Sequence, residues 1–170
     1  MIVALLAVLL SAVPQDAPTI ETLRGRAQER MRQDLSIYSG DEMRALEALY
    51  QSANRDLRAP GAKEILERVV KEYPKSNRAG SAVLYLAQMS SGAEREAYLK
   101  TAIKDHGDTW YGNGVQVGAF ARAQLAAFYA ATDKVSDAKT LAREVVERFP
   151  GAVDHSGQPL ADRLRGLKLL

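Results

Sequence analysis

Two stretches of this chain repeat one pattern of apolar residues that ends in an aromatic residue and a proline. The first runs from Ala62 to Pro74 and the second from Ala138 to Pro150, so equivalent positions lie 76 residues apart. Apolar residues recur every three or four positions within each stretch, which is the spacing of one face of an α-helix. Proline ends a helix because it lacks an amide hydrogen and clashes with the preceding turn. The pattern therefore predicts two equivalent helices that stop at equivalent prolines.

A weaker copy of the pattern lies between these two stretches. It places Leu99, Ala102 and Ile103 at the same spacing, but His106 stands in place of the aromatic residue and Gly107 in place of proline. Its distances to the other two copies are unequal, which predicts connections of different lengths. A helical repeat buries its apolar face only against its neighbours, so about three repeats are needed for a stable core. We therefore expect three stacked helix pairs.

The rest of the chain also predicts helices. Ser39 and Glu42 form a capping box for one helix, and Ser76 can cap another. Pro159 is well placed as the first residue of a last helix. Apolar residues make up 46% of the chain and charged residues 26%, which is the balance of a globular domain. The sequence predicts an all-α fold in which residues 18–170 form an antiparallel array of helix hairpins with about seven helices.

The spacing within the copies resembles the second helix of the tetratricopeptide repeat. The first-helix signature of that repeat is also present before the last copy, as Leu125, Ala126 and Tyr129. The resemblance covers about residues 40–152 and is similar to the repeats of exported bacterial members. It implies a TPR-like α-solenoid that serves as a scaffold for other proteins. The residues that match the second helix are Ala62, Leu66, Val69 and Pro74 in the first copy, and Ala138, Ala142, Val145 and Pro150 in the last.

The resemblance implies a concave groove lined by the first helices of the pairs, which would bind a protein or peptide segment. Polar contacts to an extended backbone and a few aromatic anchors would supply the affinity. Trp110 and Tyr111 lie in the glycine-rich stretch 107–114, where they either form an exposed contact or fold back onto the core. The candidate groove residues are Arg44, Glu47, Gln51, Tyr85, Gln88, Arg122 and Tyr129.

An apolar run occupies the beginning of the chain. It extends from Ile2 to Val13 and is followed by Pro14. A run of this length is too short to span a bilayer but fits the core of a secretory signal. The sequence therefore predicts a signal peptide in residues 1–17, a periplasmic or secreted protein, and no stable membrane span after processing. A buried N-terminal helix or strand is the alternative.

Composition narrows the classes of function. The chain has no cysteine, so disulfides, thiolate catalysis and cysteine-ligated zinc are excluded. The net charge is +2, and acidic and basic residues alternate along most segments, so the sequence does not predict nucleic-acid binding. One segment is richer in cations, and we interpret it as a solvated helix face. The alternative is that it contacts an acidic partner or anionic lipid. Its residues are Arg24, Arg26, Arg30 and Arg32.

The sequence contains no motif of a nucleophilic hydrolase or a zinc protease, and it predicts no catalytic residue, metal site or cofactor. The alternative is a metal-dependent or hydrolytic enzyme that uses His106, Asp108 and His155. Such a site requires these side chains to meet within metal-bond distance. The simpler role for His106 is to plug the end of a hairpin, as Tyr73 and Phe149 would.

The leucine pattern of the last helix predicts a surface for self-association. Its leucines recur at helical spacing and could dock on another copy of the chain, which would make a homo-oligomer. These residues are Leu160, Leu164, Leu167 and Leu170.

Overall fold

The computed structural model describes residues 18–170, and the predicted signal segment 1–17 lies outside the described residues. Within 18–170 the chain forms eight α-helices and one short 3-10 helix, and no strand. The all-α prediction is confirmed, with eight helices where about seven were expected. The helices are α1 (Ile20–Gln33), α2 (Gly40–Asn54), α3 (Ala62–Glu72), α4 (Asn77–Met89), α5 (Gly92–Asp105), α6 (Val117–Ala130), α7 (Val135–Arg148) and α8 (Leu160–Gly166), with the 3-10 helix η1 (Asp34–Ser36) directly after α1.

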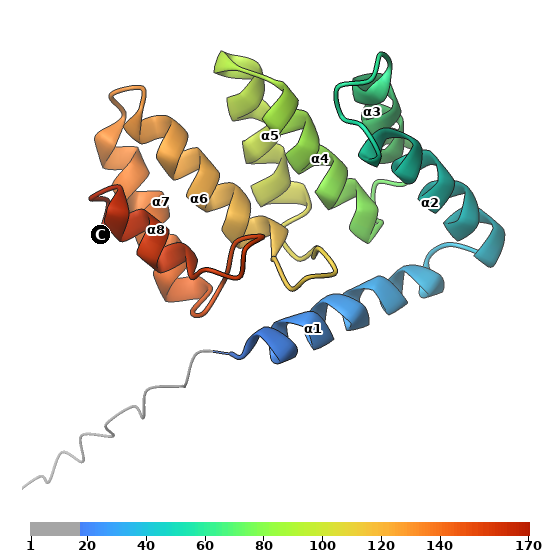
Figure 1. Ribbon diagram of the computed structural model, residues 1–170, viewed down its shortest axis with the longest axis horizontal. Helices are drawn as coiled ribbons and strands as arrows, with labels where there is room; N and C mark the ends of the chain where they lie inside the picture. Colours follow the sequence, from blue (N-terminus) through green and yellow to red (C-terminus); the bar gives the residue numbers. More distant parts are fainter. Residues whose placement is uncertain (1–17) are drawn as a thin grey trace, which may run out of the picture.

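Six of the helices form three antiparallel hairpins: α2 with α3, α4 with α5, and α6 with α7 (Figure 1). Each second helix also contacts the first helix of the next unit, so α3 touches α4, α5 touches α6 and α7 touches α8. The first helices contact one another along the array, α2 with α4, α4 with α6 and α6 with α8. This arrangement is the TPR-like hairpin array that the repeat pattern predicts.

The second helices of the three hairpins end alike. The residue after α3 is Tyr73, with φ −128° and ψ 53°, and the residue after α7 is Phe149, with φ −132° and ψ 53°. Each of these residues donates its amide to the carbonyl four positions earlier. His106 follows α5 with φ −132°. The equivalent backbone at Tyr73 and Phe149 confirms that Pro74 and Pro150 terminate equivalent helices.

Small and large apolar residues are both buried where the helices pack together. Ala126 of α6 and Ala138 of α7 are fully buried, and so are Leu66 of α3 and Leu99 of α5. Each fully buried leucine stabilises the fold by about 1.5–3 kcal/mol relative to an exposed one. Buried residues form one cluster around α2 and α3 and a larger one around the remaining helices. The partly buried residues that contact both clusters are Val70, Tyr85 and Tyr98.

The α5–α6 loop and the α7–α8 loop share one shape, whereas the α3–α4 connection is a short turn. Gly114 and Gly157 occupy equivalent places in the two long loops and have φ of 94° and 84°. These loops explain the unequal spacing of the copies, because Tyr73 and His106 lie 33 positions apart but His106 and Phe149 lie 43 apart. Each long loop is closed by an isolated antiparallel bridge, Trp110 with Gln116 and Val153 with Pro159.

Helix α1 runs across the open ends of the hairpins, where the connections between successive hairpins lie (Figure 1). Its buried residues, Leu23 and Ala27, join the larger core cluster together with Trp110. A Cβ at Gly114 would lie 3.0 Å from the Leu23 Cβ and 3.2 Å from the Arg24 amide nitrogen. Because the backbone there also needs a positive φ, glycine is the residue that fits. Helix α1 therefore packs directly against the α5–α6 loop.

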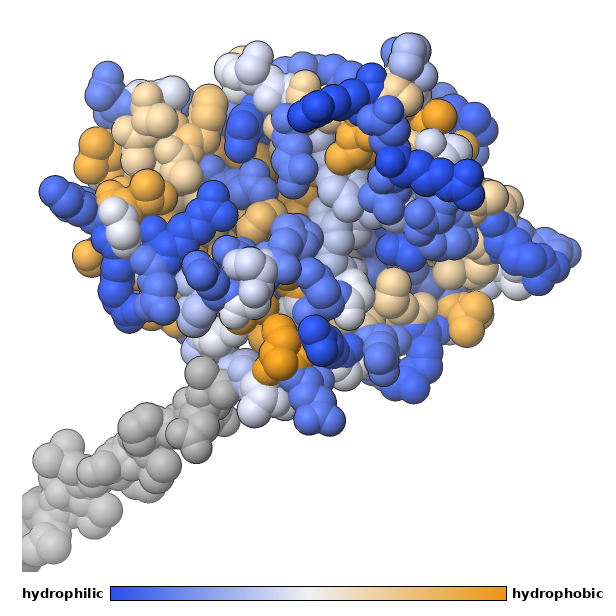
Figure 2. All heavy atoms as spheres, viewed as in Figure 1, coloured by the Kyte–Doolittle hydropathy of each residue, from blue (hydrophilic) through white to orange (hydrophobic). Residues whose placement is uncertain are grey.

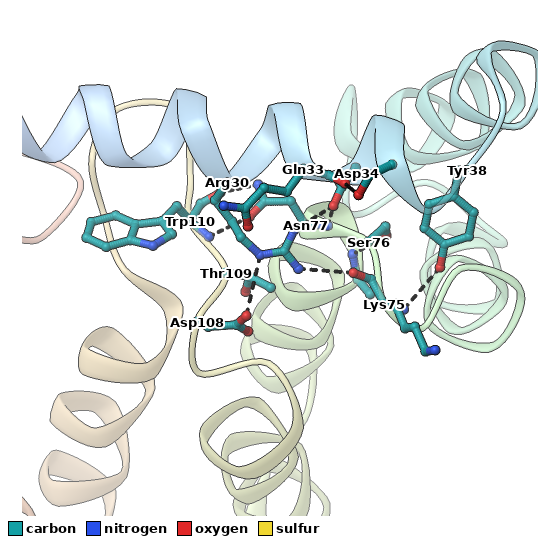
Figure 3. A network of polar contacts seen from close by, with 12 residues as sticks. Arg30, Gln33, Asp34, Tyr38, Lys75, Ser76, Asn77, Asp108, Thr109 and Trp110 are labelled. Atoms are coloured by element: carbon teal, nitrogen blue, oxygen red, sulfur yellow. Dashed lines mark hydrogen bonds and ion pairs between the residues drawn. The ribbon is translucent and has the colours of Figure 1, made fainter.

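A polar network attaches the end of α1 to two loops (Figure 3). Asp34 is 1% exposed and accepts a 2.7 Å hydrogen bond from the backbone amide of Asn77, the first residue of α4. Arg30 forms a 2.6 Å ion pair with Asp34 and donates to the Lys75 carbonyl at 3.0 Å. The Asn77 side chain exchanges two hydrogen bonds with the backbone of Trp110. A carboxylate at a helix N-terminus also complements the helix dipole.

The network corrects one expectation about the arginine-rich segment. The side chain of Arg30 is only 13% exposed, so it does not belong to a solvated face. It turns inward because Asp34, one helical turn later, is itself buried and needs a cationic partner.

The predicted caps are present. Ser39 accepts from the Glu42 amide and Glu42 accepts from the Ser39 amide, and Ser76 accepts from the amide of Ala79. Pro159 precedes α8 and stands at its N-cap rather than inside it.

No helix of residues 18–170 combines the length and the apolar character that a membrane span requires.

Candidate partner-binding surface

The first helices leave one side of the array open. Apart from its last residue, α4 keeps exposed surface along a single stripe, at Arg78, Tyr85 and Gln88. All other sides of this central helix are covered by its neighbours. Glu47 and Gln51 of α2 lie beside this stripe, because Glu47 bonds directly to Arg78. We call these five residues the inner face.

The charged residues of the inner face neutralise each other. The Arg78 guanidinium donates two 2.8 Å hydrogen bonds to the two carboxylate oxygens of Glu47. Gln51 donates a further bond of 2.7 Å to Glu47. Burial raises the pKa of Glu47, but the hydrogen bonds from Arg78 and Gln51 outweigh it and hold the pKa below its ordinary value. Glu47 therefore stays ionised at neutral pH, and its bidentate pair with Arg78 fixes α2 relative to α4.

A row of rings continues from the inner face along the array. The Tyr50 and Tyr85 rings stack with centroids 6.2 Å apart, and Tyr85 meets Tyr111 edge-on at 6.0 Å. The His155 ring contacts Tyr111 at 4.6 Å and Phe120 at 4.9 Å. Burial raises the pKa of Tyr50 and of Tyr111, so both phenols stay neutral. Tyr85 is the half-exposed member of the row and the one tyrosine among them that a ligand can reach readily.

Most of the predicted groove residues lie where a partner could contact them. Glu47, Gln51 and Tyr85 are partly exposed, and Gln88 is exposed. Arg44 is exposed beyond Glu47 on α2, where it pairs with Asp41. The structure thus brings the predicted residues of α2 and α4 together on one side. Whether they bind a partner stays a prediction.

Arg122 and Tyr129 of α6 do not line the inner face, contrary to expectation. Each is 7% exposed. Arg122 donates to Glu144 of α7 at 2.9 Å, and the Tyr129 hydroxyl donates to Glu96 of α5 at 2.8 Å. Helix α6 is apolar on nearly all sides, so its few polar groups bond to the flanking second helices. The sequence did not point to Arg78 or Phe120. Arg78 could have been found, because it lies two helical turns before Tyr85 on the same face of α4.

Trp110 and Tyr111 fold back onto the core rather than projecting from the loop. They are 8% and 7% exposed. The Trp110 backbone is held by Asn77, and the Tyr111 hydroxyl donates to the Ser81 carbonyl at 3.3 Å. Of the two sequence alternatives, the contact with the core is the one the structure shows.

The residues of the enzyme alternative do not form a joint site. His106 is 4% exposed at the end of α5, whereas Asp108 is exposed and lies 3.5 Å from the Arg30 guanidinium. His155 packs on the rings of Tyr111 and Phe120. In the part of the chain that the structure describes, no group of three or more histidines, aspartates or glutamates could hold a metal ion. His106 instead plugs the end of its hairpin.

We expect acid to destabilise the fold before the carboxylates titrate. Burial lowers the pKa of both His106 and His155. Histidine in an unfolded chain has a pKa of about 6.5, so below that pH the unfolded chain binds more protons than the folded one. The free energy of unfolding should therefore fall as the pH drops from about 6.5 to about 5, which urea unfolding across this range would measure.

His106→Tyr is the matched test, since Tyr73 occupies the equivalent hairpin end. This variant should lose part of the pH dependence, and His155→Gln should lose another part. If both variants keep the full slope of the wild type, His106 and His155 are not its cause.

The predicted self-association surface is only partly available. Leu160 and Leu164 are fully buried in the core, while Leu167 and Leu170 are 44% and 46% exposed. The inward turn of Leu160 and Leu164 fits α8 packing on α6 and α7. Figure 2 shows a face covered mostly by hydrophilic side chains, with apolar ones in separate groups. Whether the chain forms an oligomer stays a prediction.

Comparison with known families gives one match. A family model of the tetratricopeptide repeat matches residues 47–76, which cover the second half of α2, all of α3 and the turn that follows. No curated protein and no solved structure matches the chain. The matched segment lies in the first hairpin and the turn after it, and the same hairpin geometry recurs twice along the chain. The chain is therefore a tetratricopeptide-repeat-like helical repeat protein.

Proposed function

We propose that this chain is a protein-interaction scaffold that holds an extended segment of a partner protein along the inner face. The observation that carries the proposal is the packing of α2 beside α4, which turns one polar and aromatic stripe outward. Tetratricopeptide repeats typically bind protein partners. A binding role therefore suits both the fold and the exposed residues.

The chemistry of the inner face suits a peptide backbone. Gln51 and Gln88 offer amide groups that both donate and accept hydrogen bonds. Tyr85 offers an apolar ring with a polar tip, which is the character of many contact residues. Because Glu47 and Arg78 neutralise each other, the partner needs no strong charge along this stripe. Recognition then depends on backbone hydrogen bonds and one aromatic contact.

We further propose that the scaffold works in the cell envelope after export. The apolar run from Ile2 to Val13 supports this, because its length fits a secretory signal. A reporter enzyme that is active only after export, fused behind residue 30, tests the proposal. Activity is the expected result, and an inactive but stable fusion in the cytoplasm contradicts it.

A charge-matched pair of double variants tests the scaffold function. Arg44→Glu with Gln88→Glu changes the open side of α2 and α4, and Arg68→Glu with Lys71→Gln makes the same change in net charge on α3. All four side chains are exposed, so both proteins should fold. Affinity capture from the native envelope, read by quantitative mass spectrometry, should lose the bound partner only with the first pair.

The expected loss is about tenfold or more in captured partner, as for contacts at the centre of an interface. Equal capture by both double variants would mean that the inner face does not bind. Loss with the α3 pair alone would place the interface on the second helices instead.

A further inference from the structure

A second candidate site lies outside the inner face. A pocket of about 570 Å³ opens between the first half of α1, the α5–α6 loop and the end of α7. This volume falls within the range of about 300–1,000 Å³ that is usual for ligand sites. Because α1 forms one wall and belongs to no hairpin, the pocket is a feature of this chain rather than of its repeats.

The pocket has cations and no anion in its lining. Arg26 of α1 and Arg148 of α7 line it, and none of its lining residues is an aspartate or glutamate. Arg26 is exposed and forms no ion pair with any residue in 18–170. Arg148 is 60% exposed and has one loose contact, 3.8 Å from Glu144, whose carboxylate is already bonded to Arg122 at 2.9 Å. Both guanidinium groups are thus available to a ligand.

The remaining wall is apolar and aromatic. Trp110, Leu23 and Phe149 contribute to the lining. The Trp110 backbone is tied to Asn77, and in Figure 3 its indole extends away from that polar network beneath α1. Arg148 also lies over the Phe149 ring at 5.7 Å, so a cation and an apolar surface stand side by side. A ligand that combines negative charge with an apolar group would satisfy both.

We propose that this pocket binds an acidic peptide segment that carries one apolar or aromatic side chain. Its carboxylates would pair with Arg26 and Arg148, and its apolar side chain would rest on Trp110 and Phe149. The proposal builds on the scaffold function, because it takes a polypeptide as the ligand. The pocket adds a second, charge-selective contact to the neutral inner face, and α1 supplies Arg26, one of its two arginines.

Trp110 provides the readout, since it is the only tryptophan of the chain. The probe is an acetylated and amidated peptide in which aspartates flank one phenylalanine. We expect a saturable change in Trp110 emission and protection of the indole from acrylamide. Arg26→Ala with Arg148→Ala should weaken binding about tenfold or more, because each replacement removes a charged hydrogen-bond partner.

Arg24→Ala with Arg143→Ala is the matched control, since it removes the same charge from the same two helices outside the pocket. It should change the affinity by about twofold or less, as expected for exposed charges. A peptide with lysines in place of the aspartates should give no saturable change. Circular dichroism should show both double variants folded.

Three results would overturn the pocket proposal: no saturable response to the acidic peptide, equal binding by the Arg26–Arg148 variant, or phenylacetate binding as tightly as the peptide. The last would assign the pocket to a small organic acid. The scaffold function is judged separately, by capture with the variant that combines Arg44→Glu and Gln88→Glu. If that variant loses its partner while the Trp110 emission does not respond to acidic peptides, only the pocket proposal fails.

Discussion

Replacing Gly118 by alanine is expected to lower the free energy of unfolding by about 3 kcal/mol. Gly118 lies in the first turn of α6, where a Cβ would sit 2.5 Å from the Gly107 carbonyl oxygen and 2.8 Å from the Gly107 Cα. Both atoms belong to the backbone, so they cannot rotate away as a side chain would. Either α6 or the α5–α6 loop must shift. The melting temperature should fall by about 6–12 °C in a thermal scan.

Gly25→Ala is the control for the loss of glycine itself. Gly25 is an exposed residue inside α1, and a Cβ there would meet nothing within 4 Å. Alanine at this position should stabilise the chain by about 0.5–1 kcal/mol, because glycine is costly within a helix. Opposite signs for the two variants are the expected outcome. A melting temperature for Gly118→Ala equal to that of the wild type would contradict the close approach of α6 and the loop.

Replacing Asp34 by alanine is expected to lower the free energy of unfolding by about 2–3 kcal/mol. The buried carboxylate accepts from the Asn77 amide and pairs with Arg30, so its loss leaves a donor and a partly buried cation without their partner. Arg30 keeps its bond to the Lys75 carbonyl, which limits the cost. Hydrogen exchange should show the largest loss of protection in α1 and in the first turn of α4.

Asp34→Asn separates the two roles of this side chain. The amide can still accept from Asn77 but carries no charge for Arg30, so the loss should be smaller than for alanine. Asp41→Ala is the matched control, because Asp41 also pairs with an arginine but its side chain is 88% exposed. That change should cost less than about 1 kcal/mol. If Asp41→Ala costs as much as Asp34→Ala, burial is not what makes the Asp34 network matter.

The hairpins could be predicted because their signals are local. Apolar residues at helical spacing, Pro74 and Pro150 after aromatic residues, and the Ser39–Glu42 capping box each act within one or two turns of chain. Such signals report which residues form a helix and where it ends. They do not report how one helix lies against segments distant in sequence.

The position of α1 escaped prediction for this reason. Its apolar residues, Leu23 and Ala27, are those of any amphipathic helix, and its partners are a loop about ninety residues later. One signal was available. Gly114 and Gly157 lie 43 residues apart, the same interval as His106 and Phe149, which indicates two equivalent loops rather than one irregular stretch. The longer loop is what gives α1 a surface on which to pack.

The candidate site was predictable on α2 and α4 but not on α6. Gln51 and Gln88 are polar residues on helices that have apolar and polar sides, so their outward direction follows from periodicity. On α6 nearly every position is apolar, and the polar Arg122 and Tyr129 are drawn inward by Glu144 and Glu96. The inward direction of these two side chains depends on where the neighbouring helices α5 and α7 lie. The spacing of residues in the sequence does not give those positions.

Site-specific photo-crosslinking is the most direct test of the central claim that the inner face, on α2 and α4, binds a partner. A photoreactive amino acid at Gln88 of α4 should crosslink a discrete partner in the native cell, and the same probe at Lys71 of α3 should not. Both positions are exposed, so the probe itself should be tolerated at each. A crosslink from Lys71 but none from Gln88 would contradict the claim.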